Sequence, residues 1–243
     1  MLGPELETYK GNKGFMAAMG ILGLFLALML VLAFVSRHPN PVLGICVLIL
    51  LVGPVLTFLW LLSLRVTLHS DGISYHTLFG EKEMRWDAVD RFYYSAIETR
   101  AYHLGVGATP VGTTYRFKFV YAEGKTLVLG SRVAKPEKLG PKLIEYSYPA
   151  LFRKVVDQFN NGQEVDFGAI RLSRDTGIKV KKRFGYQEIP WNQVSRWWIQ
   201  EGRFHIYHQG QTGSYLAPRI RKIPNAFVLN GLLNSILKQR AAA

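Results

Sequence analysis

A set of eight residues recurs in this chain at a constant spacing of 105 positions, and this repeat limits the folds open to the part that contains it. The first copy contains Gly72, Ile73, Phe79, Gly80, Glu83, Trp86, Val89 and Arg91, and the second contains Gly177, Ile178, Phe184, Gly185, Glu188, Trp191, Val194 and Arg196. Unrelated segments of this length would share only about one such residue, so the pattern predicts a duplicated module. Two copies form a tandem pair, because a solenoid needs about three or more stacked repeats.

Two uncharged apolar runs precede the repeat. They cover Phe15–Val35 and Val42–Leu64, and only a short polar segment with two prolines separates them. Each run is long enough to cross a hydrocarbon core, which needs about 20 apolar residues. The pattern predicts a transmembrane helical hairpin that enters and leaves the membrane on one side. A buried core hairpin in a soluble protein is the alternative.

The charges beside these runs predict an orientation. The first run is longer than the apolar core of a signal peptide and lacks a small-residue cleavage site, so we expect a retained anchor. Lys10, Lys13 and Arg65 flank the runs, whereas the linker carries only Arg37. The positive-inside rule therefore favours cytoplasmic N- and C-termini. The predicted organisation is an N-terminal tail (1–14), a hairpin (15–65) and two modules (66–162 and 163–243), and a chain shortened to begin near residue 66 is expected to fold alone.

Each module is predicted to be a meander of antiparallel strands followed by one helix. Alternating, β-branched segments separated by glycine turns predict the strands. They are Arg65–His69, Ile73–Phe79 and Tyr115–Tyr121 in the first copy, and Phe167–Arg174, Ile178–Phe184 and Arg203–His208 in the second. Apolar residues at helical spacing predict the helices, at Pro149–Asn160 and after Pro224–Asn225. The first copy carries an insertion, which is best placed in Ala101–Thr114.

This order of parts resembles a known kind of membrane protein. The Gly-Ile pair at Gly72 and the Trp-Asp-Ala-Val stretch that begins at Trp86 resemble the PH-like domains of bacterial membrane proteins. The segments around Gly168, Trp191 and Asn225 are similar to the second half of an uncharacterised family built this way. The resemblance covers nearly all of residues 15–240. It implies a transmembrane hairpin in the bacterial inner membrane and two tandem PH-like domains, each a partly open antiparallel barrel capped by a C-terminal α-helix, mainly β with α.

The repeated residues have expected structural roles. Gly72 and Gly177 lie where a tight turn favours a positive φ, which glycine adopts without steric cost. Ile73, Phe79 and Trp86, with their counterparts in the second copy, are expected to fill the core. The two tryptophans could instead be ligand platforms, but both copies keep them while the charges around them differ. Core packing is therefore the favoured interpretation.

Catalytic and cofactor motifs are not apparent. His205 and His208 are expected on opposite faces of one strand, which does not suit joint metal binding. The pair Gly105 and Gly107 lacks the third glycine and the strand-to-helix setting of a dinucleotide site. We therefore expect no enzyme activity, no metal or cofactor and no evident small-molecule substrate.

The second copy is strongly basic, with 13 Lys and Arg against five Asp and Glu in residues 164–243. Alternation puts Lys179, Lys181 and Arg183 on one face of a strand. The predicted patch for an anionic partner consists of Arg171, Arg174, Lys179, Lys181, Arg183, Arg219, Arg221 and Lys222. Near a membrane it would contact anionic lipid headgroups or an acidic protein. A solvated basic face is the alternative, and nucleic acid is disfavoured because no recognition helix or RNA-binding signature occurs.

The insertion provides a second candidate contact. It is small, apolar and uncharged, and an exposed loop of this kind suits a partner or membrane contact. The candidate residues are Gly105, Val106, Gly107, Pro110 and Val111. A long hairpin that folds back onto its own domain is the alternative.

Two functional hypotheses follow. The first is a membrane-anchored scaffold whose modules bind a protein partner or the anionic membrane surface. The second is an accessory subunit of a larger membrane complex, docked through the hairpin. Small residues that permit close helix approach motivate the second hypothesis. They are Ala17, Gly20, Gly23 and Ala27.

Overall fold

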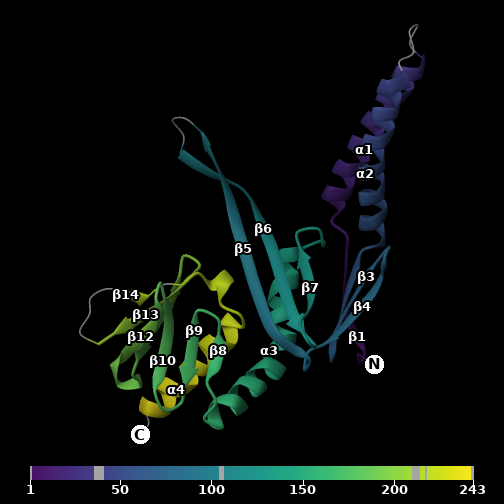
Figure 1. The fold of residues 1–243 in the computed structure, drawn as a ribbon. Helices are drawn as coiled ribbons and strands as arrows, with labels where there is room; N and C mark the ends of the chain where they lie inside the picture. Colours follow the sequence, from purple (N-terminus) through teal and green to yellow (C-terminus); the bar gives the residue numbers. More distant parts are fainter. Residues whose placement is uncertain (1, 36–40, 104–106, 210–213, 217, 242–243) are drawn as a thin grey trace. The chain divides into compact units, whose positions relative to one another are not determined.

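A computed structural model describes residues 2–35, 41–103, 107–209, 214–216 and 218–241. The chain divides into two compact units, which are described separately (Figure 1). The first comprises residues 1–85 and 130–139, and the second comprises residues 86–129 and 140–243. This division follows contacts within the folded chain, whereas the predicted modules 66–162 and 163–243 follow the sequence repeat.

The first unit consists of a helical hairpin and a four-stranded antiparallel sheet with the order β1-β2-β3-β4. The helices are α1 (Lys13–Val35) and α2 (Pro41–Ser63). The strands are β1 (Glu5–Lys10), β2 (Arg65–His69), β3 (Gly72–Thr77) and β4 (Gly80–Arg85). Strand β1 lies within the segment expected to be an N-terminal tail. Its partner β2 follows the hairpin in sequence, so local patterning did not reveal the pairing.

Strands β1 and β2 hold the two ends of the hairpin together. Lys10 pairs with Arg65 in the ladder, and the Gly11 amide donates to the Leu64 carbonyl at 3.1 Å. A Cβ atom at Gly11 would lie 2.2 Å from the Leu61 carbonyl oxygen, so only glycine permits this approach. Asn12 then caps α1 by accepting from the Gly14 amide. The start of α1 and the end of α2 therefore lie side by side.

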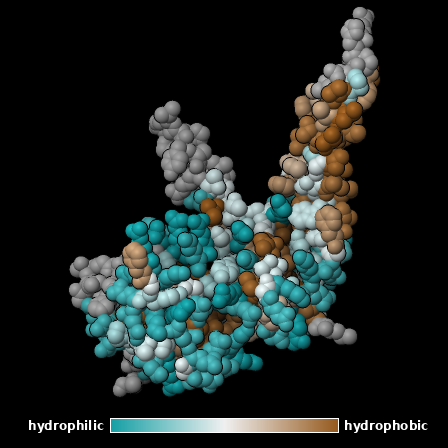
Figure 2. Space-filling model, in the orientation of Figure 1, coloured by the Kyte–Doolittle hydropathy of each residue, from teal (hydrophilic) through white to brown (hydrophobic). Residues whose placement is uncertain are grey.

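Both helices are long and apolar enough to cross a membrane. Large side chains remain exposed along their length, for example Leu24 and Val35, which are 74% and 77% exposed. Figure 2 shows this apolar surface along the hairpin. Gly20, Gly23 and Ala27 are only half-exposed, and Gly20 lies against the Phe58 ring of α2.

The second unit contains three antiparallel sheets, with the orders β5-β6-β7, β11-β10-β9-β8 and β12-β13-β14. Its strands and helices are β5 (Val89–His103), β6 (Gly107–Tyr121), β7 (Lys125–Gly130), α3 (Pro136–Asn160), β8 (Val165–Phe167), β9 (Ile170–Ser173), β10 (Gly177–Lys182), β11 (Gly185–Ile189), η1 (Trp191–Gln193), β12 (Val194–Gln200), β13 (Arg203–His208), β14 (Ser214–Leu216), η2 (Ile220–Lys222) and α4 (Ala226–Ala241).

Several predicted boundaries were wrong, and the strands expected to end at Phe79 and Phe184 end at Thr77 and Lys182. The helix predicted to begin at Pro149 begins at Pro136, and Pro141 and Pro149 both lie inside it. The strand predicted from Phe167 to Arg174 is interrupted at Gly168, where φ is +72°. A turn there separates β8 from β9.

The repeat recurs in the backbone. Strand β10 spans the same positions as β3 after a shift of 105 residues, and both four-stranded sheets have the same strand order. A Cβ atom at Gly72 would lie 2.4 Å from the Met84 carbonyl oxygen, and one at Gly177 would lie 2.2 Å from that of Ile189. The expected positive φ occurs at Gly177 but not at Gly72. The shared requirement is therefore close backbone approach.

The repeated aromatic residues divide into two groups. Trp86 and Trp191 are buried, as expected for core residues, and the Trp191 indole donates to the Ser173 carbonyl at 2.9 Å. Phe79 and Phe184 are 83% and 88% exposed, so their assignment to the core was wrong. Each lies in the turn of a β-hairpin, immediately before a glycine with positive φ.

Strand β5 is fixed to the segment before α4 by Asn225. The Asn225 side chain accepts from the Phe92 amide at 2.8 Å and donates to the Asp90 carbonyl at 2.9 Å. Its own amide donates to the Phe92 carbonyl. Phe92 also packs against Phe227 of α4, with ring centroids 5.6 Å apart. Residues of both predicted modules thus share one packed core within the second unit.

The insertion extends the β5–β6 hairpin. The ladder continues to the pair His103 and Gly107, so Gly107, Pro110 and Val111 belong to β6. Gly105 and Val106 lie outside the described residues. Residues 96–99 and 112–114 are exposed on both strands of the ribbon.

Candidate anion-binding surfaces

The eight basic residues of the predicted patch lie in three places. Arg171 and Lys179 face each other across β9 and β10, and Arg174 lies in the turn beyond β9. Lys181 and Arg183 lie at the end of β10 and in the turn toward β11. Arg219, Arg221 and Lys222 lie in or beside η2, before α4.

Arg171 and Lys179 both donate to the carboxylate of Glu164. Glu164 accepts from the Lys179 ammonium at 2.6 Å and from the Arg171 guanidinium at 3.1 Å. Asp166 lies 3.8 Å from the Arg171 Nε atom, and the guanidinium also covers the Tyr186 ring at 4.3 Å. The hydrogen bond from Lys179 lowers the pKa of Glu164 and raises the pKa of Lys179 itself. This pair therefore stabilises the sheet more readily than it binds a ligand.

Arg174 also has a structural role. Its guanidinium donates to the carbonyl of Asn160, the last residue of α3, at 3.0 Å. Basic side chains commonly bind the unpaired carbonyls at helix C-termini.

The turn between β10 and β11 forms a basic and aromatic tip, which we define as Lys181, Lys182, Arg183 and Phe184. All four residues are exposed, so alternation does not separate Lys181 and Arg183 from Lys182 and Phe184 as it had predicted. Arg183 lies in the turn, because β10 ends at Lys182. The Arg183 guanidinium lies 5.3 Å from the centre of the Phe184 ring. The corresponding turn of the first copy contains Leu78 and Phe79, both exposed, but no basic residue.

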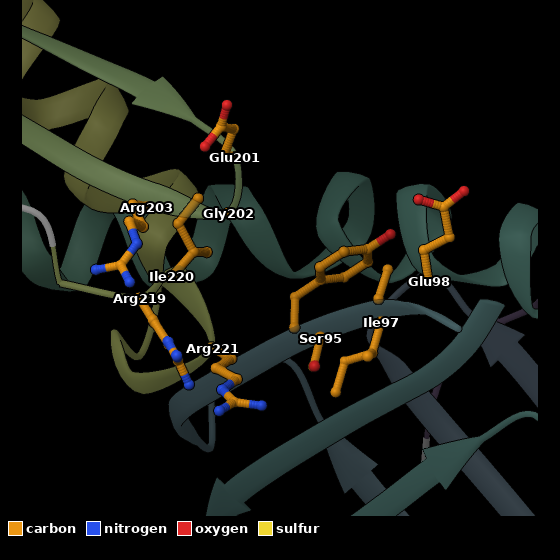
Figure 3. Close-up of a pocket in the computed structure, with 11 residues that line it drawn as sticks. Ser95, Ile97, Glu98, Glu201, Gly202, Arg203, Arg219, Ile220 and Arg221 are labelled. Atoms are coloured by element: carbon orange, nitrogen blue, oxygen red, sulfur yellow. The ribbon is translucent and has the colours of Figure 1, made fainter. Parts of the chain in front are cut away.

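Arg219 and Arg221 line a cavity of about 510 Å³ together with Arg203 (Figure 3). Arg203 and Arg219 pair in an isolated antiparallel bridge, supported by hydrogen bonds from the Phe204 amide to the Pro218 carbonyl and from the Ile220 amide to the Gly202 carbonyl. Lys222 is not among the lining residues. The sequence predicts only that Arg203 begins a strand. Its proximity to Arg219 depends on this bridge, which local sequence patterns do not reveal.

A family model for the family of unknown function DUF6585 matches residues 1–242. The chain belongs to DUF6585. No curated protein matches the chain. Membership of DUF6585 agrees with the resemblance to an uncharacterised family, and it assigns no activity to these surfaces.

The basic surfaces of this DUF6585 chain suit binding rather than proton transfer. Arginine stays protonated at any physiological pH, so it does not act as a general acid or base there. Within the described residues, no group of three or more His, Cys, Asp or Glu side chains is arranged to hold a metal ion. The chemistry that these residues offer is recognition of an anion.

Proposed function

We propose that the chain is a membrane-anchored binding protein, with two tandem PH-like domains, that engages the anionic surface of the bacterial inner membrane through its basic and aromatic tip. The observation that carries the proposal is the tip itself, where Phe184 is 88% exposed beside exposed Lys181 and Arg183. An exposed phenylalanine among cations suits a water–membrane boundary. A protein partner is the second source of anionic groups.

The basic residues and the phenylalanine of the tip would both contribute to the free energy of membrane binding. Each basic residue near an anionic membrane surface contributes about 1 kcal/mol, and a fully buried phenylalanine contributes about 1.5–3 kcal/mol. The tip therefore supplies a weak, reversible attachment. Such an attachment is effective in a protein already held at the membrane, because tethering raises the local concentration of the surface it meets.

The hairpin is the proposed anchor. A soluble protein rarely exposes large continuous apolar patches, whereas both helices expose apolar side chains along their length. Their paired ends require both flanking segments to lie on one side of any membrane that the hairpin crosses. The basic residues Lys10, Lys13 and Arg65 at these ends favour the cytoplasmic side for both termini and both PH-like domains.

The accessory-subunit hypothesis receives less support. Of the four small residues that motivated it, Ala17 is exposed and Gly20, Gly23 and Ala27 are half-exposed. Gly20 lies against Phe58 of α2, so it fits packing within the hairpin as well as docking to a partner.

The proposal is tested by lysine footprinting of the full chain in nanodiscs. Acetylation of Lys181 is measured by mass spectrometry in neutral phosphatidylcholine and in discs containing phosphatidylglycerol. We expect the anionic lipid to slow acetylation of Lys181 about fivefold, since about 1 kcal/mol of attraction is involved, and salt to reverse the effect. Lys238, an exposed residue of α4, is the internal control.

Two matched variants assign the effect. Phe184→Ala is expected to reduce the protection, because the apolar contribution is lost while the cations remain. Phe79→Ala, at the repeated position of the first copy, is expected to leave it unchanged. Equal acetylation of Lys181 in both lipids would exclude the membrane surface and leave a protein partner as the ligand of the tip.

A further inference from the structure

The cavity beside η2 has the features of a built anion site. Its walls come from three segments of the second unit, namely residues 94–98 of β5, the β12–β13 turn at residues 201–203, and residues 219–221. Its volume of about 510 Å³ lies within the range of about 300–1,000 Å³ that is typical of small-molecule pockets.

Three arginines line this cavity. Arg203 and Arg219 are directly opposed in an antiparallel bridge, where like charges are destabilising. Arg221 lies two residues further along η2 and also lines the cavity. In the described part of the chain, Arg219 and Arg221 make no ion pair. Their guanidinium groups are therefore available to an anion.

The other lining residues indicate what kind of group could accompany the anion. Ile97, 47% exposed, and Ile220 supply apolar surface, and the two carboxylates are Glu98 and Glu201. In Figure 3 these carboxylates lie apart from the guanidinium groups of Arg219 and Arg221, which extend in the same direction. The cavity thus has a cationic end and an apolar wall. It fits a phosphate group attached to a less polar body.

Hydrogen bonds fix the segments that carry these side chains. The Ile220 amide donates to the Gly202 carbonyl at 2.9 Å, which joins η2 to the β12–β13 turn. Asn225 binds β5 at Asp90 and Phe92, only a few residues from Tyr94. A backbone that is already ordered reduces the entropy lost when a ligand binds.

We propose that Arg203, Arg219 and Arg221 form a binding site for a phosphate monoester, distinct from the basic and aromatic tip. Planar guanidinium groups bind phosphate oxygens in a bidentate manner, which favours arginine over lysine at such a site. The phosphate belongs either to a soluble ester or to a lipid headgroup whose chain follows the apolar wall. The site does not depend on attachment of the tip to a membrane.

The test is calorimetric titration of the full chain in a neutral detergent with two probes, glycerol 3-phosphate and short-chain dioctanoyl phosphatidic acid. We expect saturable binding of at least one probe. Phosphatidic acid that binds tenfold or more tightly than the soluble ester identifies a lipid ligand. Similar affinities identify a soluble phosphate ester. Absence of binding by both probes at millimolar concentration would overturn the proposal.

Variants locate the binding. The double variant Arg219→Gln/Arg221→Gln should weaken binding about a hundredfold or more, because each charge-assisted hydrogen bond contributes roughly a factor of ten. The double variant Arg219→Lys/Arg221→Lys keeps the charge but not the planar fork, and should lose about tenfold. Arg153→Gln removes one arginine charge from the exposed face of α3, outside the cavity. It should bind the probes with wild-type affinity. Unchanged affinity in the Gln variant would also overturn the proposal.

The two proposals fail independently. Phe184→Ala should leave probe binding intact in detergent, and the Gln variant should leave the protection of Lys181 in anionic nanodiscs intact. Because Arg219 and Arg221 are exposed, we expect both double variants to fold, which their thermal unfolding midpoints verify.

Discussion

At the scale of single residues, Asn225 shows how one polar side chain joins distant parts of the chain. It is 6% exposed, adopts a φ of +52° and binds backbone groups of β5 some 133 residues away in sequence. Both ends of its amide are used, and asparagine is one of the few residues with a Cβ atom that tolerates this backbone conformation. No spacing or periodicity in the sequence points to these partners.

Substitution of Asn225 separates its two roles. Asn225→Ala leaves the Phe92 amide and the Asp90 carbonyl unpaired and strains the backbone, so we expect a loss of about 2–5 kcal/mol of unfolding free energy. Asn225→Gly loses the same hydrogen bonds without the strain and should be less destabilised by about 1 kcal/mol. Thermal unfolding followed by tryptophan fluorescence measures both. Equal midpoints for wild type and the Ala variant would contradict the assigned role.

Glu164 predicts a dependence of stability on pH. Its pKa is lowered in the folded chain, chiefly by the hydrogen bond from Lys179, so its contribution is present above the unfolded pKa of about 4.3. That contribution, about 1 kcal/mol or less for an exposed pair, is lost as the pH falls through the lower, folded value. Glu164→Gln should therefore be less stable than wild type at pH 7, and the difference should shrink as the pH is lowered below about 4.3. A constant difference between the two proteins across this range would argue against the ion pair.

At the scale of secondary-structure elements, the burial of strand residues was predictable from the sequence, whereas the exposure of residues in turns was not. Alternation identified β2, β3, β10 and β13 because one face of each strand is buried. It misplaced Phe79 and Phe184, since a turn interrupts the alternation that distinguishes the buried face from the exposed one. Helix α3 was predicted too short because prolines usually end helices, yet Pro141 and Pro149 both lie inside it.

Removal of β1 tests its contribution as an element. The strand supplies the edge of the sheet and pairs with β2 across the hairpin, so a chain lacking residues 2–10 should expose the edge of β2. We expect a lower thermal midpoint and a greater tendency to aggregate, since unpaired strand edges promote association. Size-exclusion chromatography in detergent measures the second effect. A monodisperse, equally stable deletion variant would show that the strand is dispensable, and would support independent folding from about residue 66.

At the scale of the whole molecule, the apolar runs predicted the two long helices and the repeat predicted antiparallel sheets, whereas long-range pairing determined the two compact units and the candidate sites. The residues of the predicted patch divide into a pair that shares Glu164, an arginine bound to the end of α3, the tip, the arginines of the cavity, and Lys222 outside it. Lys179 is not a good candidate for ligand binding because it already donates to Glu164, 15 residues away in sequence. Arg203 is a candidate because the backbone bridge places it beside Arg219. Charge counting identifies which half of the chain is basic, whereas the fold determines which of those charges remain available.

The pairing of β1 with β2 has a consequence for how the protein is made. Strand β1 leaves the ribosome first, but its partner is synthesised only after both apolar helices. If the hairpin crosses a bilayer, both strands lie on the same side, whereas insertion of one helix alone would leave β1 and β2 in different compartments. Closure of this sheet edge would therefore act as a checkpoint on membrane insertion, and a chain inserted incorrectly would display an open strand edge that quality-control proteases and chaperones can recognise.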